Sequence, residues 1–366
     1  MGKKAVSLLF HAVTVGLCLM TAVATALGVI SSRIDPHCFP AGPFLGLLLP
    51  VLIVLDAVFL IYWLVRRRRW FWFSAVALLV SLDFVFSLFR ISFAQEPKPD
   101  GTEFRVATYN THNFTYSGNP RIIMDRIVTF MEEQQVDVLC MQEFQGHYRF
   151  GADSMVRVFG TYPYYFVPER NQEGTGLAIF SRYPIRNMGA RTFHPGGNGT
   201  MWADVDVDGQ TVRIFNNHLQ TTDLNNNRAE LVKEVSAQNP GGEERAVKKM
   251  VSDMFRNNLL RAEQADFVYS MVDTASVPVI VCGDFNDPPS SYAYHRMRSE
   301  LNDAFRKSGH GYGYTFRPFF RSLRIDYIFY SDELESVGYA SPDLPLSDHK
   351  PVITDLRRRE EKRCLP

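Results

Sequence analysis

The sequence predicts an α/β domain preceded by a membrane-embedded segment. From about residue 103 onwards, short apolar runs of strand type alternate with stretches of helical periodicity. Most of these runs stop abruptly at polar, glycine or proline residues, as buried strands do. The first hundred residues instead contain three long apolar runs in succession, which a soluble domain would not bury.

The three apolar runs are each long enough to cross a bilayer as a helix. We expect transmembrane helices over about residues 6–30, 44–65 and 70–93, which make residues 1–93 a membrane anchor. The first run also has small residues in cleavage-site spacing up to Ala26, so a signal peptide is the alternative, although its apolar core is longer than usual. Asp56 and Asp83 lie within the second and third runs. We expect them to bond between helices, because no third polar group marks a transport path.

Positive charge orients the anchor. Lys3 and Lys4 precede the first run, and Arg66 to Arg69 separate the second run from the third. The positive-inside rule places both clusters in the cytoplasm, so the chain leaves the third helix on the outer side. We therefore expect an integral protein of the inner or plasma membrane whose soluble domain faces the periplasm or the cell exterior.

The soluble domain is expected over residues 103–356, between a linker at 94–102 and a charged tail at 357–366. Residues 1–99 carry nine of the 39 Lys and Arg residues and four of the 39 Asp and Glu residues, which leaves the remainder with a balance of −5. A mildly acidic domain lacks the broad basic surface of a general nucleic-acid binder. The five cysteines are scattered, without the spacing of a disulfide framework or a structural zinc site.

Strand and helix signals alternate along this domain. Helical periodicity marks residues 120–134, where Ile123 and Ile127 belong to an apolar face, and a longer stretch at 225–272 that a Pro-Gly-Gly sequence at 240–242 interrupts. The strand-type runs are residues 104–109, 136–141, 176–181, 202–207, 211–216, 279–282, 325–330 and 352–354.

Six of these runs carry polar residues of one kind at or near an end. They are Asn110; Gln142 and Glu143; Asn216, Asn217 and His218; Asp284 and Asn286; Asp326; and, before the last run, Ser347, Asp348 and His349. In this order they resemble the endonuclease/exonuclease/phosphatase superfamily, whose members include pancreatic deoxyribonuclease, apurinic endonucleases, neutral sphingomyelinases and inositol polyphosphate 5-phosphatases. The resemblance covers about residues 103–356; each motif alone is unspecific, whereas all six in family order are specific. It implies a four-layer α/β/β/α sandwich and a metal-dependent phosphoric ester hydrolase.

Oxygen donors at neighbouring strand ends suit a hard divalent cation such as Mg²⁺ or Mn²⁺. We expect Glu143 as the first ligand and Asn110 as the second, and the resemblance adds Asp348. Alternatives stay open here, because Glu143 could be a surface acid at a strand end and amides such as Asn110 also serve turns. Some family members carry an acid where this chain has His112, so metal ligation that depends on that acid is in doubt.

His349 is the candidate general base, because an imidazole can take a proton from water near neutral pH. It needs a carboxylate to hold its tautomer, and Asp326, inside an otherwise apolar strand, suits that role. In the family the matching acid pairs with the final histidine. The alternative is a buried ion pair of Asp326 with Arg324 or another base.

Further roles follow from the resemblance. His218 would donate to the scissile phosphate, although a histidine there could also cap a strand. Asp284 would orient the attacking water or protonate the leaving oxygen, and Asn286 would hold a phosphoryl oxygen as charge grows in the transition state. Arg182 and Asn217 are expected substrate contacts, with a surface turn as the alternative for Arg182.

Together these residues predict a membrane-anchored, Mg²⁺-dependent phosphohydrolase. We expect a phosphodiesterase that cleaves a phosphate ester by in-line attack of water. The short linker at residues 94–102 keeps the site near the bilayer, which favours a lipid phosphate over duplex DNA. An extracytoplasmic nuclease is one alternative. An inactive binding or scaffold protein is the other, although an inactive relative would be expected to lose part of the polar set.

Reporter fusions test the topology. Alkaline phosphatase joined after residue 100 is expected to be active, and green fluorescent protein exported there by the general secretory route is expected to be dark, because two positive clusters hold the preceding loops in the cytoplasm. The same reporters joined after Arg69 are the control with the opposite pattern. A bright fluorescent fusion after residue 100 would overturn the predicted orientation.

Overall fold

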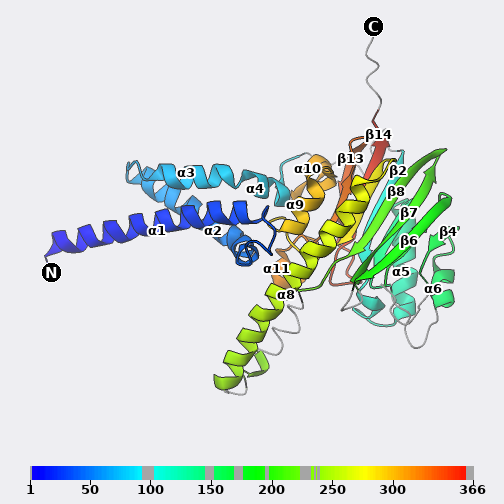
Figure 1. Cartoon of the computed structure of the whole chain (residues 1–366), viewed down its shortest axis with the longest axis horizontal. Coiled ribbons are helices and arrows are strands. Elements are labelled where there is room, and N and C mark those ends of the chain that lie inside the picture. The colour runs from blue at the N-terminus through cyan, green and yellow to red at the C-terminus, as the bar shows by residue number, and fades with distance from the viewer. Residues whose placement is uncertain are drawn as a thin grey trace, which may run out of the picture. The chain divides into compact units, whose positions relative to one another are not determined.

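The structure is a computed structural model that describes residues 2–92, 103–144, 152–168, 176–193, 198–222, 232–234, 236 and 240–359. The chain divides into two compact units, whose helices and strands are labelled in Figure 1. Unit 1 comprises Met1–Ser87 and Pro288–His295, and unit 2 comprises Leu88–Asp287 and Arg296–Pro366.

Apolar helices form most of unit 1. The N-terminal helices are α1 (Lys3–Ser31), α2 (Gly42–Val65), α3 (Phe71–Val80) and α4 (Leu82–Leu88). Both α1 and α2 are long and apolar enough to span a membrane, and α3 with α4, which are bent by 53° at the break between them, count as a third such segment only if the pair is one span. The continuous helix expected over residues 70–93 is therefore interrupted at Ser81 and ends at Leu88.

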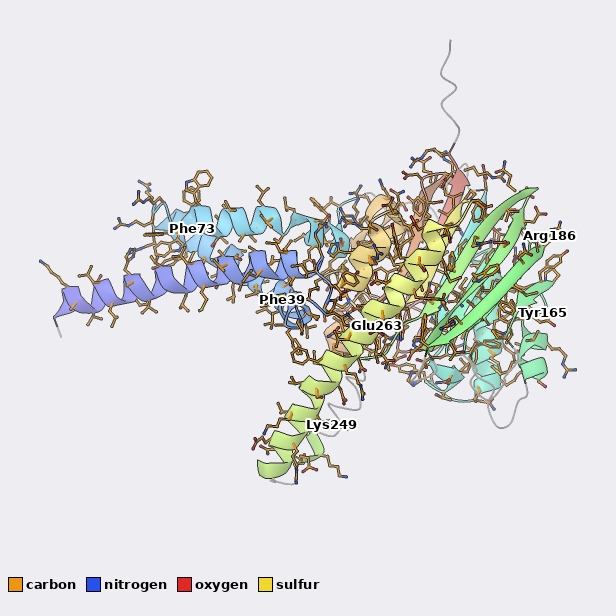
Figure 2. The ribbon with its side chains drawn as sticks, in the orientation of Figure 1. Phe39, Phe73, Tyr165, Arg186, Lys249 and Glu263 are labelled. Carbon is orange, nitrogen blue, oxygen red and sulfur yellow. The ribbon has the colours of Figure 1, made fainter. Side chains whose placement is uncertain are left out.

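Large apolar side chains of these helices are exposed. Among them are Phe73 of α3, which Figure 2 labels, and Phe10, Val54 and Leu79, each of which is more than half exposed. A surface of this kind is stable when lipid rather than water surrounds it. The exposure pattern thus agrees with helices that could lie in a bilayer.

Both acids within the apolar segments have partners from another segment. The Thr25 hydroxyl of α1 donates to Asp56 Oδ2 of α2 at 2.6 Å. Arg33, in the loop after α1, forms an ion pair with Asp83 of α4 at 3.2 Å. These contacts are of the interhelical kind expected from the sequence, since a polar group inside lipid needs a partner.

Two six-stranded sheets form the centre of unit 2. In spatial order, the first sheet contains β13 (Leu334–Ala340), β14 (Val352–Arg358), β2 (Phe104–Asn110), β3 (Val138–Gln142), β5 (Ala178–Ser181) and β4 (Tyr164–Phe166). The second sheet contains β10 (Asn302–Asp303), β12 (Asp326–Tyr330), β9 (Val279–Asp284), β8 (Gln210–His218), β7 (Asn198–Val207) and β6 (Ile185–Phe193).

The two sheets pack face to face. Their shared core includes Val106 and Cys140 from the first sheet and Ile214, Ile280 and Ile328 from the second, all fully buried. Helices cover the outer faces: α5 (Pro120–Glu133) and α6 (Ala152–Val158) on the first sheet, and α8 (Pro240–Asp273) on the second. Unit 2 is thus the four-layer α/β/β/α sandwich that the sequence predicted.

Several short elements complete the chain. They are β1 (Phe89–Arg90), η1 (His112–Phe114), α9 (Tyr292–Arg298), α10 (Ala304–Ser308), β11 (Gly311–Tyr312) and α11 (Pro318–Arg321). Of the sheet strands and covering helices described above, β4, β6, β10, β13 and α6 were not predicted from the sequence. Most side chains of β6 are exposed or half-buried, so this edge strand lacks an apolar pattern.

Helix α8 begins at Pro240, inside the interruption predicted from the sequence. Proline is well tolerated in the first turn of a helix, where its missing N–H leaves no hydrogen bond unmade. Most of the helical stretch expected before residue 240 lies outside the described residues.

Strand direction brings the polar ends of each sheet to one edge. In the first sheet, β2 and β3 are parallel and end at Asn110 and Gln142. In the second, β8 and β9 are parallel and end at His218 and Asp284. β12 runs antiparallel to β9 and starts at this edge, with Asp326 opposite Asp284.

Residues that the sequence assigns to the third membrane helix form strand β1 of unit 2. Phe89 pairs with Tyr312, and Arg90 pairs with Gly311. Unit 2 begins at Leu88, the last residue of α4, whereas the soluble domain was expected to begin at residue 103. The linker expected at residues 94–102 lies outside the described residues.

Substitution of Gly283 tests whether the close approach of β9 to β8 leaves room for a side chain. A Cβ at this position would lie 2.0 Å from the Asn217 carbonyl oxygen, and the φ of Gly283 is +132°. We expect Gly283→Ala to prevent folding or to lower the free energy of unfolding by more than about 4 kcal/mol, a size reached only by severe defects. Thermal and denaturant unfolding of the purified protein in detergent measure this.

Gly209→Ala is the matched control. Gly209 has a φ of +84°, but nothing lies within 4 Å of its Cβ position. Its substitution should add only backbone strain, about 1–2 kcal/mol. Equal destabilisation by the two substitutions would mean that the contact between Gly283 and Asn217 imposes no constraint.

Candidate active site

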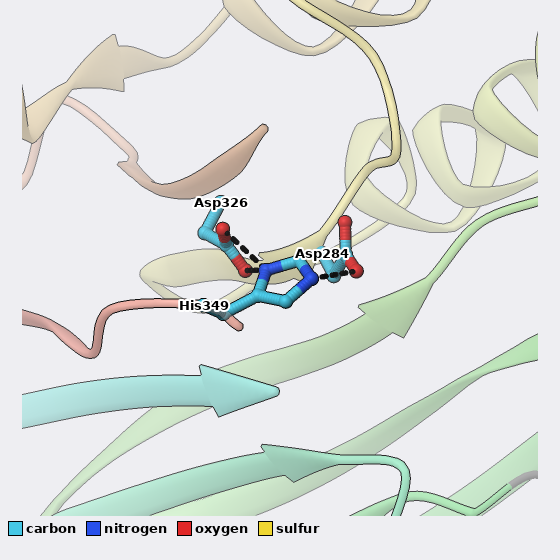
Figure 3. Close-up of side chains that lie close together, drawn as sticks. All are labelled: Asp284, Asp326 and His349. Atoms are coloured by element: carbon cyan, nitrogen blue, oxygen red, sulfur yellow. Dashed lines mark hydrogen bonds and ion pairs between the residues drawn. The ribbon is translucent and has the colours of Figure 1, made fainter. Parts of the chain in front are cut away.

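His349 and Asp326 form a hydrogen-bonded pair beside Asp284 (Figure 3). The Nδ1 atom of His349 lies 2.9 Å from Oδ2 and 3.1 Å from Oδ1 of Asp326. Its Nε2 atom lies 3.6 Å from Oδ2 of Asp284. All three side chains are buried, and the antiparallel register of β12 and β9 sets the two acids side by side.

The surroundings of the pair fix its geometry. Arg324, the alternative partner of Asp326, donates from both terminal nitrogens to Asp303, at 2.6 and 2.8 Å. The Phe316 ring lies against the His349 imidazole, with centroids 4.9 Å apart. Asp326 thus holds Nδ1 of His349, and Nε2 is the ring nitrogen that faces Asp284.

The charges of neighbouring groups shift the pKa values of His349 and Asp284. Burial by itself lowers the pKa of the His349 imidazole, but the Asp326 and Asp284 carboxylates outweigh it and raise that pKa to about 10. Burial also raises the pKa of Asp284, and the neighbouring His349 opposes this shift. With a pKa of about 10, the His349 imidazole carries a proton at neutral pH. It must lose that proton before it can accept one from water.

The Asn110 amide lies between two carboxylates. Its Nδ2 atom donates to Glu143 Oε1 at 3.1 Å and to Asp284 Oδ2 at 2.9 Å, which joins the strand ends of the two sheets. Its Oδ1 atom accepts from the backbone N–H of His112 at 3.0 Å. Asn110 thus presents nitrogen, not the expected ligand oxygen, to a point where two carboxylates favour positive charge.

Asp348 lies beside His112, the residue found where some family members carry an acid. Its Oδ1 atom is 3.1 Å from Nδ1 of His112. That hydrogen bond raises the pKa of His112. Burial would raise the pKa of Asp348, but His112 and the charge of His349 together lower it. The Asp348 carboxylate, expected as a metal ligand, is therefore already stabilised as an anion by two imidazoles.

His218, at the end of β8, approaches the same carboxylates. Its Nε2 atom lies 3.8 Å from Asp284 Oδ2 and 4.0 Å from Glu143 Oε1. The His218 side chain is 13 % exposed, compared with 5 % for His349 and 1 % for Asp284. Of these three it is therefore the group most accessible to a ligand.

Two asparagines with predicted roles hold backbone groups. The backbone N–H of Asn286 donates to Asp284 Oδ1 at 2.8 Å. The side-chain Nδ2 of Asn286 donates to the Leu219 carbonyl at 3.0 Å. Asn217 Nδ2 donates to the Cys282 carbonyl at 2.9 Å. Because strand side chains alternate, Asn217 points to the face of β8 opposite to that of its neighbours. Their contacts with a substrate stay predictions.

Arg182 lies at the opposite end of the first sheet, which contradicts the expected substrate contact. Its backbone N–H donates to the Asp137 carbonyl at 2.9 Å, and its guanidinium lies 3.8 Å from the Asp137 carboxylate. Asp137 precedes β3 and Glu143 follows it, so about 20 Å of strand separates them. Because β5 runs antiparallel to β3, a residue that follows β5 lies away from the site.

Four residues around the site have left-handed backbone conformations. The φ angles are 49° for His112, 51° for Asn113, 54° for Glu143 and 53° for Asn286. Such conformations cost on the order of 1–3 kcal/mol each for most residues and persist only where the surroundings fix them. Backbone strain of this kind is common at functional sites, and here it lies at the edge where the polar strand ends meet.

Some residues that shape the site were given no role from the sequence. They are Asn113, Thr315, Phe316 and Ser347. Asn113 donates to Glu143 Oε2 at 3.0 Å, and the Ser347 hydroxyl donates to the Asn110 carbonyl at 2.8 Å. Proximity in sequence to Asn110 and Asp348 was a signal for these two. No such signal exists for Phe316, or for Thr315, whose hydroxyl accepts from the backbone N–H groups of Ile325 and Asp326.

Glu143 is the expected ligand most open to a divalent cation. Ligand atoms of Asp284, Asp326 and His349 also lie within 4.8 Å of one another. In that group, however, Asp326 and Nδ1 of His349 already satisfy each other. Glu143 accepts hydrogen bonds only, and its side chain is 25 % exposed, so a hydrated cation can reach it. A carboxylate with room for water ligands fits Mg²⁺ or Mn²⁺.

A four-layer sandwich with histidines and carboxylates at one edge is the architecture of metal-dependent phosphate ester hydrolases. The chain belongs to the Endonuclease/Exonuclease/phosphatase family, whose model matches residues 107–349. A second family model, described as a domain of unknown function, matches residues 9–88. The chain thus has the fold of a family of hydrolases, joined to an apolar N-terminal segment.

Individual relatives are distant. A protein of Escherichia coli (strain K12), named only as uncharacterized protein YbhP, is 26 % identical over 287 residues, which are 70 % of this chain and 99 % of that protein. A mannosyl-6-phosphatase structure from Bacteroides thetaiotaomicron is 19 % identical, with 69 % and 99 % of the two chains covered and a TM-score of 0.49. The human Nocturnin catalytic domain with bound sulfate is 19 % identical, with 73 % and 97 % covered and a TM-score of 0.48.

The charge state of His349 can be measured by NMR. In protein without added cation, the imidazole should stay protonated at neutral pH and titrate near pH 10, well above its ordinary value of 6.5. Because the folded-state pKa is the higher one, protonation stabilises the fold fully below pH 6.5, and this stabilisation is lost as pH rises through 10. Asp326→Asn should lower the His349 pKa, since a carboxylate partner is removed. An unchanged titration in that variant would contradict the assigned pair.

Proposed function

We propose that the protein is a membrane-anchored, divalent-cation-dependent phosphodiesterase. The observation that carries the proposal is the His349–Asp326 pair, whose Nε2 atom faces Asp284 at 3.6 Å while the Asn110 amide joins Asp284 to Glu143. A proton acceptor, a buried acid and a carboxylate suited to a cation thus surround one point. Hydrolysis of a phosphate ester needs these three groups.

His349 acts on the attacking water. Water attacks phosphorus in line with the ester oxygen, its proton passes to Nε2 of His349, and the bond from phosphorus to the ester oxygen breaks. Asp326 accepts the hydrogen bond from Nδ1 and stabilises the imidazolium that forms. The proton that His349 holds in the resting state has to leave before this step.

The remaining groups act on the phosphate and the leaving oxygen. Asp284 either protonates the leaving oxygen, which burial favours by raising the pKa of this carboxyl, or orients the attacking water. His218, which lies within 4.0 Å of both Glu143 and Asp284, donates to a phosphoryl oxygen. A cation held by Glu143 would supply positive charge that offsets the negative charge of the phosphate.

Substitutions at the site test this assignment. His349→Ala, Asp284→Ala and Glu143→Ala should each lower kcat on bis(p-nitrophenyl) phosphate with Mg²⁺ by about 10²- to 10⁴-fold, the usual contribution of an acid–base group. Glu143→Ala should also raise the Mg²⁺ concentration that gives half-maximal rate. Near-normal turnover in folded His349→Ala protein would remove the proposed base.

Glu335→Ala is the matched control for the carboxylate substitutions. Glu335 forms a surface ion pair with Arg357, and both side chains are 42 % exposed. Its loss should leave both kcat and the Mg²⁺ requirement unchanged. Wild-type protein that folds but hydrolyses no phosphate ester would instead favour the alternative of an inactive binding or scaffold protein.

We propose further that the substrate is a phosphodiester at a membrane surface, such as a phospholipid. Two observations support this. Strand β1 follows the apolar helix α4 without an intervening linker, and β1 pairs with β11 of the same unit. Unit 2 is therefore joined to the apolar segment by a very short connection. The net negative charge of the remainder of the chain also gives no broad attraction for DNA. A tethered nuclease remains the second candidate, since it would need the same anchor.

Direct competition between substrates decides this point. With Mg²⁺, intact protein in detergent should release phosphorylated headgroups from phospholipid or sphingolipid vesicles faster than it cleaves linear DNA at equal phosphodiester concentration. His349→Ala protein is the control for contaminating nucleases and lipases. Rapid DNA cleavage without lipid turnover would exclude the lipid substrate and leave the phosphodiesterase assignment intact.

A further inference from the structure

A buried arginine of α8 lies between the two loops that leave the site. The first loop follows His218 at the end of β8, and the second follows Asp284 at the end of β9. Arg261 is only 1 % exposed. Its Nη1 atom donates to the Gln220 carbonyl at 2.7 Å and to the Thr222 hydroxyl at 2.9 Å.

The same guanidinium reaches the second loop. Its Nε atom lies 3.1 Å from Oδ2 of Asp287, three residues after Asp284. Its Nη2 atom donates to Asn258 Oδ1 at 2.6 Å, one turn earlier on α8. Arg261 thus contacts both loops from one rigid helix, with its remaining nitrogen fixed by that helix.

Other bonds join the loops to each other and to α8. The Thr222 hydroxyl donates to the Asn286 carbonyl at 3.2 Å, and the Asn286 amide donates to the Leu219 carbonyl at 3.0 Å. The Gln220 N–H donates to Gln264 Oε1 at 2.7 Å, one turn after Arg261. Removal of the guanidinium would therefore loosen a network rather than one contact.

Only an arginine suits this position. Its planar group offers donors in several fixed directions, whereas a lysine presents one compact charge on a flexible stem. A buried cation is costly unless it is paired and hydrogen-bonded; here Asp287 forms an ion pair with it and three oxygens accept from its terminal nitrogens. The bonds of Arg261 given above go to the two loops and to α8, not to Glu143 or His349. Since its burial is costly, we look for its role at these loops.

We propose that Arg261 is a positioning residue, which holds the loop after His218 against the loop after Asp284 and so sets the place of His218 and Asn286 in the site. The kinetic part of this inference rests on the proposed hydrolase function. Misplacement of a reacting group by about 1 Å can cost on the order of 10²-fold in rate. Loss of the guanidinium should therefore lower kcat by about that factor and leave KM within about threefold, because no substrate contact is removed.

The test compares substitutions at two arginines of the same helix. Arg261→Met keeps the length of the side chain without its donors, and Arg261→Lys keeps the charge without the planar group. Arg256→Met is the control, because Arg256 is 67 % exposed and forms a local ion pair with Asp253 at 3.3 Å on the same helix. Thr222→Val removes one acceptor without a buried charge, so it serves if Arg261→Met does not fold.

Hydrogen exchange gives a readout that needs no activity. The amides of Leu219, Gln220 and Asn286 are bonded to the Asp284 carbonyl, Gln264 and the Asp284 carboxylate. Their exchange should accelerate by more than about tenfold in Arg261→Met, and less in Arg261→Lys and Thr222→Val, while amides within β9 stay unchanged. Arg256→Met should match the wild type at all of them.

Kinetics on bis(p-nitrophenyl) phosphate with Mg²⁺ complete the test. The expected result is a fall in kcat of about 10²-fold with little change in KM for Arg261→Met, and partial recovery in Arg261→Lys. Unchanged loop exchange, or a variant that exchanges faster but turns over normally, would overturn the positioning role. If wild-type protein shows no hydrolysis, the proposed function fails, and the exchange data alone decide whether Arg261 holds the loops.

Discussion

The buried amide of Asn216 ties the two sheets together directly below the site. Its Nδ2 atom donates to the carbonyls of Met141 and Ala178 in the opposite sheet, both at 2.9 Å, and its Oδ1 atom accepts from Gln142 Nε2 at 2.6 Å. An apolar contact would tolerate sliding of one sheet over the other, whereas these three bonds fix their register. Glu143 lies one residue beyond Gln142, so the fixed register carries directly into the site.

The site depends on this register because neither sheet contains all of its groups. The first sheet supplies Asn110, and the second supplies Asp284 and Asp326. The Asn110 bond to Asp284 and the His349 bond to Asp326 both cross from one sheet to the other. The acids that surround this point repel one another, and the amide and imidazole donors between them offset that repulsion.

Much of the site was predictable because polar residues at the ends of apolar strands are costly without a purpose. Asp326 and His349 were paired from that argument and the resemblance, and they share a hydrogen bond. Arg182 was misplaced because sequence does not show strand direction, and β5 runs antiparallel to β3. Arg261 gave no signal at all, since an arginine in a polar helix usually faces solvent and only the packing of α8 buries it. The break at Ser81 was hidden in the same way, because the apolar run continues through it.

The pairing of β1 with β11 has a practical consequence for anyone who shortens the chain to obtain a water-soluble enzyme. The expected start of the domain at Glu103 is an attractive place to cut, but a cut there discards Phe89 and Arg90. Gly311 and Tyr312 would then lose their partner strand and expose unpaired backbone, an edge that promotes aggregation. A soluble version that begins just before Phe89 retains this edge pairing while it omits the long helices α1 and α2.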